Sequence, residues 1–210
     1  SRIIEQTRVL KPFGYILHLA PERYGPIPAE YVRTWLIQSE KSVIDLLQRT
    51  GVDPLLLGIE TLGYPLDLVD SIISRYGLGV TLDIGHLHLM GYDVEDHVKR
   101  YASRCRVFHL HGVNEGTDHL GLHRGDREKI DRFLDLLASL EDGIERVVTL
   151  EVFDQESFEG SMEVLHERTR EEKPGNLGDR GWTKREKHVG GSIRSIPRRE
   201  AGLSGDRRSV

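Results

Sequence analysis

Five short, nearly continuous apolar runs alternate with helical patterns, and this alternation limits the folds that the chain can adopt. The runs are FGYILHLA (13–20), LLLGIETL (55–62), GVTLDIG (79–85), RVFHLHGV (106–113) and RVVTLEVF (146–153). None shows the strict apolar–polar alternation of a strand with one face in water, so we expect strands that are covered on both faces. Helices are predicted at 28–51, 67–76, 93–104, 127–141 and 157–167.

Alternating strands and helices predict parallel strands that are joined by right-handed crossovers. Two architectures fit, an open doubly wound sheet and an eight-stranded α/β barrel. No Gly-rich phosphate loop follows the first run, which disfavours the nucleotide-binding form of the open sheet. Polar residues instead gather near the carboxyl ends of the runs, where a barrel places its active site. The sequence therefore favours an α/β barrel of the TIM type.

The length of the apolar pattern indicates a partial barrel followed by a tail. A complete barrel takes about 250 residues, whereas the foldable pattern covers 1–169 and begins without Met in a segment that resembles a helix end, SRIIEQTRVLKP. We expect that the first two strands and their helices are missing, which would leave open sheet edges. Residues 170–210 contain 11 Lys and Arg, 6 Asp and Glu and 7 Gly. We predict a basic, disordered tail there.

Composition excludes several classes of partner. The tail carries a charge of +5, so residues 1–169 carry −10 of the total of −5, which argues against a nucleic-acid surface. No apolar run is long enough for a membrane span, and no signal peptide is evident. The single cysteine, Cys105, excludes an intramolecular disulfide and suits a reducing cytoplasm. We expect a cytoplasmic protein with a small-molecule substrate; the sequence does not indicate its oligomeric state.

Each apolar run carries a potential metal ligand at or near its carboxyl end. In chain order, these residues are His18, Glu60, Asp83, His109 and Glu151. Further candidates follow the third and fourth runs: His86, His111, Asp118 and His119. A lone carboxylate at a strand end is more often a helix N-cap or an ion-pair partner, but five successive strands with such ends favour one shared metal site.

The chemistry of this set narrows the choice of metal. Carboxylates and imidazoles without thiolates suit Zn²⁺, Mn²⁺ or Fe²⁺, and we expect zinc or manganese. The remaining histidines are expected at the surface or satisfied by local contacts: His88, His97, His123 and His166.

The segments GIETL, LDIGHLHLMGYD, VFHLHGVNEGTDHLGL and VTLEVF resemble, in this order, the xylose-isomerase-like barrel superfamily. That superfamily includes sugar-phosphate isomerases and epimerases and endonuclease IV. The resemblance implies that a divalent metal is bound by Glu60, Asp83, His109 and Glu151. It also implies that His86 is a further ligand or a substrate contact.

Within the superfamily, LDIGHLHLMGYD followed by FHLHGV, DHLGL and TLEVF is most similar to the cobamide-remodelling phosphodiesterases, over roughly residues 12–168. This likeness implies hydrolysis of the phosphoribosyl linkage in the nucleotide loop of cobamides, with release of cobinamide phosphate. That family has N-terminal strands, one with a histidine in a His-Leu-Pro context, that have no counterpart here. Residues after Thr169 do not resemble it.

On this reading, His86 and His18 complete the metal shell or bind a second ion. His111, Asp118 and His119 would then orient the phosphate or move a proton.

Two other functions remain open from the sequence. In a sugar or sugar-phosphate isomerase or epimerase, the same metal would bridge two substrate oxygens while Glu60 and Glu151 move the proton. Arg124 could supply the arginine that such enzymes commonly place in the loop after the fourth strand. The third reading is a non-catalytic barrel fragment that retains the ligands but does not form the pocket.

Overall fold

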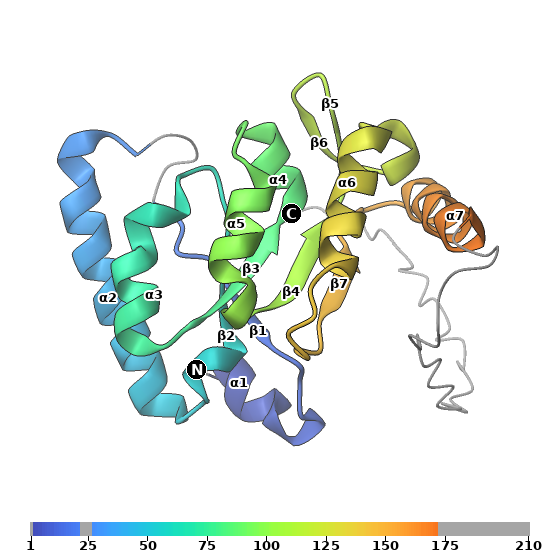
Figure 1. Ribbon diagram of the computed structural model, residues 1–210. Helices are drawn as coiled ribbons and strands as arrows, with labels where there is room; N and C mark the ends of the chain where they lie inside the picture. Colours follow the sequence, from blue (N-terminus) through green and yellow to red (C-terminus); the bar gives the residue numbers. More distant parts are fainter. Residues whose placement is uncertain (1, 22–26, 172–210) are drawn as a thin grey trace, which may run out of the picture. The chain divides into compact units, whose positions relative to one another are not determined.

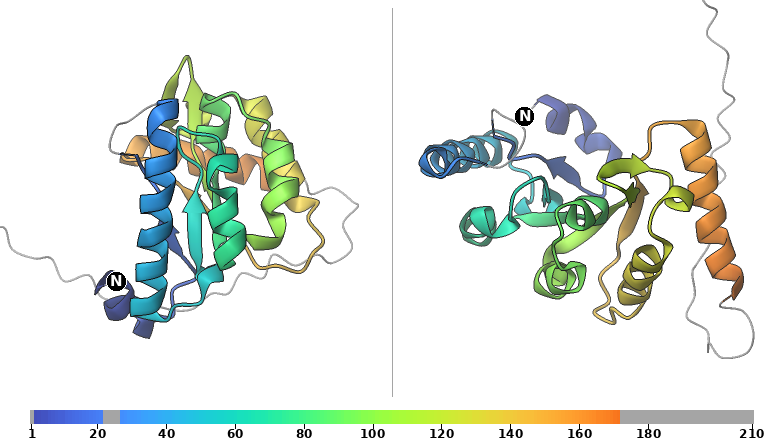
Figure 2. Two further views of the ribbon diagram at one scale, coloured as in Figure 1. Left: turned by 90° about the vertical axis from the view of Figure 1, so that its left-hand side faces the viewer. Right: turned by 90° about the horizontal axis from the view of Figure 1, so that it is seen from above.

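The computed structural model describes residues 2–21 and 27–171, so the predicted tail at 170–210 lies almost entirely outside the described residues. Its main sheet has five parallel strands in the order β1–β2–β3–β4–β7. These are β1 (Tyr15–Leu17), β2 (Leu57–Glu60), β3 (Gly79–Asp83), β4 (Cys105–Leu110) and β7 (Val147–Leu150). All five predicted strands are present, and viewed along the strands they form an arc (Figure 2). The sheet is therefore half of a barrel.

Helices connect successive strands and cover the outside of this arc (Figures 1 and 2). They are α2 (Ala29–Thr50), α3 (Asp70–Tyr76), α5 (Val94–Tyr101) and α6 (Arg127–Ala138), with α1 (Arg2–Thr7) before β1 and α7 (Gln155–Glu171) after β7. Short 3₁₀ turns extend several of these elements: η1 (Arg8–Leu10), η2 (Pro54–Leu56), η3 (Leu66–Val69), η4 (Ala102–Arg104) and η5 (Leu122–Arg124). The five predicted helices are thus confirmed, with shifted ends.

The core between the sheet and the outer helices explains why the strands lack polar alternation. Every residue of β2 and β3 is buried. Phe133 of α6 packs on Phe108 of β4, with ring centroids 5.4 Å apart. Both faces of the central strands are therefore removed from water, as the apolar runs predicted.

Two elements at the carboxyl ends of the strands are not evident from periodicity. The short helix α4 (Ile84–Leu89) begins directly after β3, because a side-chain oxygen of Asp83 accepts a hydrogen bond from the His86 backbone N–H. The hairpin of β5 (Gly112–Asn114) and β6 (Thr117–Leu120) follows β4. Its two turn residues, Glu115 and Gly116, both have positive φ, as in a type I′ turn.

Arg146 anchors the start of β7 to the neighbouring strand connection. Its guanidinium donates to the carbonyl oxygens of Cys105, at 3.1 Å, and Ala102, at 2.9 Å. It also pairs with the carboxylate of Asp142 at 2.5 Å, and this hydrogen bond holds the pKa of Asp142 at about 2.

Within the described residues, no helix is both long and apolar enough to cross a membrane.

We expect Phe133→Ala to lower the free energy of unfolding by about 3–5 kcal/mol, because it removes a buried aromatic ring from the contact with β4. Ile37→Ala on α2 is the control, since Ile37 is 57% exposed, and a change within about 0.5 kcal/mol is expected there. Urea unfolding followed by circular dichroism measures both values. Equal effects of the two substitutions would contradict the packing described.

The ion pair of Asp142 should make stability depend on acid pH. Its folded-state pKa lies below that of an unfolded aspartate, so its contribution is complete above the unfolded pKa and is lost as the pH falls toward about 2. Asp142→Asn should therefore destabilise the protein at pH 6, and the difference from the native chain should narrow between roughly pH 5 and pH 3. Unfolding curves at several pH values test this, and a difference that is constant with pH would contradict it.

Candidate metal centre

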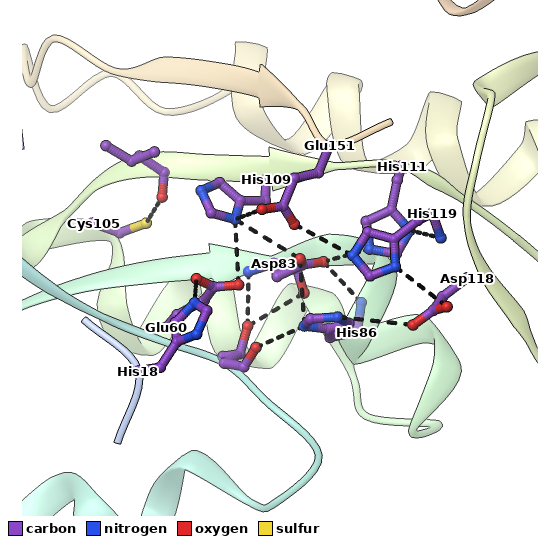
Figure 3. A network of polar contacts seen from close by, with 12 residues as sticks. His18, Glu60, Asp83, His86, Cys105, His109, His111, Asp118, His119 and Glu151 are labelled. Atoms are coloured by element: carbon purple, nitrogen blue, oxygen red, sulfur yellow. Dashed lines mark hydrogen bonds and ion pairs between the residues drawn. The ribbon is translucent and has the colours of Figure 1, made fainter. Parts of the chain in front are cut away.

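Four neighbouring strands bring four ligand-capable side chains to one point at the rim of the sheet (Figure 3). Glu60 and Asp83 end β2 and β3, His109 lies near the end of β4, and Glu151 directly follows β7. One ligand atom of each lies within 4.8 Å of the others. We call these four residues the principal group. Parallel strands place their carboxyl ends at the same rim, so residues up to 91 positions apart in sequence meet there.

His109 lies among the three carboxylates of the principal group. Its Nδ1 is 3.3 Å from Glu60 Oε1, 3.4 Å from Glu151 Oε1 and 3.9 Å from Asp83 Oδ2. Burial lowers the pKa of His109, but the contacts with Glu151 and Glu60 outweigh it and raise that pKa to about 10. In the protein without metal, a proton on His109 thus supplies part of the positive charge that these three carboxylates require.

Asp83 uses its two side-chain oxygens differently. Oδ1 accepts the 2.9 Å hydrogen bond from the His86 N–H that caps α4. Oδ2 is fully buried and has no hydrogen-bond partner, and the same holds for Nδ1 of His109. Burial alone would raise the pKa of Asp83, but His111 and His86 lower it to about 2. An ionised oxygen and a ring nitrogen that face each other in the interior without hydrogen-bond partners are groups that a cation would satisfy. The principal group therefore fits a divalent metal.

Thr61 orients two of these elements and was not singled out from the sequence. Its hydroxyl accepts from the backbone N–H of Asp83 at 2.7 Å, which ties the ends of β2 and β3 together. Its carbonyl oxygen lies 3.0 Å from Nδ1 of His86. A carbonyl only accepts, so Nδ1 of His86 carries a proton and the neutral ring keeps a lone pair on Nε2. The position of Thr61, directly after Glu60, is the only sequence signal for this role.

A second set of histidines lies beside the principal group. His86, His111 and His119 also place ligand atoms within 4.8 Å of one another, and we call them the imidazole group. Asp118 adjoins it, with one oxygen 3.2 Å from Nδ1 of His119 and the other 4.0 Å from Nε2 of His86. Nε2 of His119 is 3.6 Å from Glu151, so the two groups are contiguous.

Two further side chains border the site. His18 follows β1, and its Nε2 lies 2.6 Å from Glu60 Oε2, although the side chain is 57% exposed. Phe153, which sequence reasoning did not select, is 79% exposed. Its ring stacks on His119 with centroids 5.0 Å apart. An aromatic residue two positions after a rim glutamate is the signal that could have identified it.

The four histidines that were expected to lie at the surface or in local contacts, and Arg124, lie outside both groups. His88 is half-buried beside α5 and α6, and burial lowers its pKa. Nδ1 of His97 lies 2.7 Å from the carbonyl oxygen of Asp93. His123 and Arg124 are exposed in η5, and His166 is exposed on α7.

Comparison with known proteins places this arrangement in a family. Comparison with curated protein sequences gives no significant match. Among solved structures, the crystal structure of the apo form of 3-keto-D-glucoside 4-epimerase, YcjR, from E. coli superposes with a TM-score of 0.59 and 15% sequence identity. The superposition covers 80% of this chain and 68% of the epimerase, and at this identity it shows a common fold. The family described as xylose isomerase-like TIM barrel matches residues 2–172. The chain therefore belongs to the xylose isomerase-like TIM barrel family.

Proposed function

We propose that the chain is a divalent-metal-dependent enzyme whose principal ion is held by Glu60, Asp83, His109 and Glu151. The observation that carries this proposal is the buried Oδ2 of Asp83, which has no hydrogen-bond partner and lies 3.9 Å from Nδ1 of His109, which also has none. Their mixture of carboxylate and imidazole suits zinc or manganese. A divalent ion bound there would polarise a substrate oxygen and lower the pKa of a water molecule.

We propose hydrolysis of a phosphoester as the reaction, with the nucleotide loop of a cobamide as the substrate. The imidazole group favours hydrolysis over isomerisation. Its nitrogens lie next to the principal group, which already offers enough ligands for one ion, so they can bind a second cation or a phosphate. Nε2 of His86 has its lone pair free, since Nδ1 is engaged with Thr61. His86, His119 and Asp118 can therefore hold a second cation or contact a phosphate. The motif likeness to the cobamide-remodelling phosphodiesterases supplies the particular substrate.

The roles of the individual side chains follow from their exposure and contacts. His119 is partly exposed and lies between Asp118 and Glu151, so it can donate a proton to a leaving oxygen and recover a proton from the water molecule that hydrolysis consumes. His18 is exposed beside Glu60 and can bind a substrate oxygen or an ion. Phe153 presents a ring face to solvent next to His119, which suits an apolar face of a bulky substrate.

Sugar epimerisation is the second candidate, and a specific observation favours it. Glu60 and Glu151 contact His109 through separate oxygens from different strands, at 3.3 and 3.4 Å. Two carboxylates placed around one metal position could remove a proton from a substrate carbon and return it from another direction. The similar structure is that of an enzyme named as an epimerase of a keto-glucoside.

Asp83→Asn should weaken the binding of Mn²⁺ or Zn²⁺ at least about tenfold, because it removes the ionised oxygen that faces His109. Asp45→Asn is the matched control, since Asp45 lies on the exposed surface of α2 and pairs with Arg49. Isothermal titration calorimetry measures both affinities. Equal affinities for the two variants would remove Asp83 from the metal site.

Metal-loaded protein incubated with adenosylcobalamin should release cobinamide phosphate, which chromatography with mass detection identifies. His119→Ala should slow this release by roughly 10²-fold or more, because it removes the proton donor, while metal binding by the principal group persists.

A parallel incubation with ketoses and 3-keto-glucosides tests the alternative reaction. Epimerised sugar without corrinoid turnover would replace hydrolysis by epimerisation. A chain that binds no stoichiometric metal and turns over neither substrate would support the non-catalytic reading.

A further inference from the structure

His111 lies between the hairpin β5–β6 and Asp83, and its side chain is fully enclosed. None of the side chain is exposed. One face of the ring stacks on His119, with centroids 4.3 Å apart and planes within 10° of parallel. The ring also packs against the backbone of Gly85 in α4, where a Cβ atom would lie only 2.1 Å from Cε1 of His111. The ring therefore has no path to a substrate, and Gly85 is required for its position.

The hydrogen bonds of His111 fix which ring nitrogen carries the proton. Nδ1 accepts a 2.9 Å hydrogen bond from the backbone N–H of His119. A proton on Nδ1 would point at that N–H, so the longer, 3.3 Å approach of Nδ1 to the Gly112 oxygen is not the bond that decides the tautomer. The neutral ring consequently carries its proton on Nε2. Ring rotation would replace Nδ1 by a carbon atom and leave the His119 N–H without its acceptor.

The protonated Nε2 of His111 faces Asp83, 3.1 Å from Oδ1. Like Oδ2 of Asp83, Nε2 of His111 is buried without a well-formed hydrogen bond. It differs in carrying a proton in this tautomer, and at 3.1 Å that N–H lies against a carboxylate oxygen. His86 has the opposite tautomer, with a proton on Nδ1 toward Thr61 and a free lone pair on Nε2. Of these two members of the imidazole group, His86 is prepared to bind a cation and His111 is not.

We propose that His111 is a positioning residue that couples the hairpin β5–β6 to the metal ligand Asp83. The hairpin presents the His119 N–H from a residue with φ of +53°, and this N–H sets the ring of His111. The ring, in turn, engages Oδ1 of Asp83 and leaves Oδ2 directed at His109. This inference rests on the proposed function, in which Asp83 binds the principal ion. Within the imidazole group, His86 and not His111 would then offer a nitrogen to a second cation.

Nitrogen NMR of the Zn²⁺-loaded native protein tests the assignment directly. Long-range ¹H–¹⁵N correlations should show His111 as the neutral Nε2–H form and His86 as the Nδ1–H form. A metal-bound Nε2 on His111 would overturn the proposal. This measurement does not depend on any variant being folded.

Variants at position 111 separate positioning from ligation. His111→Leu removes both contacts, so Zn²⁺ affinity should fall about 10- to 100-fold and hydrogen exchange at the His119 amide should accelerate. His111→Gln can place an amide N–H near the position of Nε2, and it should restore the affinity to within about threefold of native. His97→Gln, outside both groups, is the control and should change neither quantity.

Three results would contradict the coupling. A lost equivalent of bound zinc in both position 111 variants would make His111 a ligand. Native affinity and native exchange in His111→Leu would leave it without a positioning role. Native affinity in His111→Leu with faster exchange would uncouple the hairpin from Asp83. The variant Asp83→Asn separates the hypothesis of the principal metal site from that of His111 as a positioning residue. Undiminished zinc binding by this variant would reject the principal metal site, whatever the result for His111.

Discussion

The convergence of three carboxylates on one imidazole at the rim of the sheet is the constraint on which the rest of the site depends. Glu60, Asp83 and Glu151 surround His109, and two of these carboxylates are almost fully buried. Such a concentration of negative charge in the interior requires a cation. Without metal, Glu151 and Glu60 raise the pKa of His109, so a proton on this ring meets part of this requirement. A divalent ion would meet it with more charge and would pair the atoms that now lack partners.

Hydrogen bonds with the backbone at the strand ends hold the buried carboxylate of Asp83 in place. Asp83 serves at once as the N-cap of α4 and as a potential ligand, because each function takes a different oxygen. Thr61 joins the same strand end to its neighbour and also sets the tautomer of His86. The capping role that is ordinary for a strand-end aspartate therefore does not compete with metal binding here. It orients the carboxylate for that role.

The sequence does not distinguish the histidines at the rim, but in the structure they differ in which ring nitrogen their neighbours engage. His86 faces a carbonyl through Nδ1, whereas His111 faces a backbone N–H through Nδ1, so their protons lie on opposite nitrogens. The first ring can offer a lone pair to a cation, and the second offers an N–H to Asp83. His119 is stacked between His111 and Phe153, and 23% of its side chain is exposed to solvent.

The sequence by itself determined the parallel α/β architecture and the strand ends that carry side chains able to bind a metal. Continuous apolar runs require cover on both faces, and a metal-competent residue at the end of each run is visible in one dimension. Only the tertiary structure decided which atoms meet. The hairpin, α4, Thr61, Gly85 and Phe153 acquire their roles through contacts between strand ends and loops whose direction no periodicity encodes. The tautomer of His86 depends on one hydrogen bond with Thr61, 25 positions away, and that of His111 on one with His119, 8 positions away. Both tautomers therefore follow from the folded geometry alone.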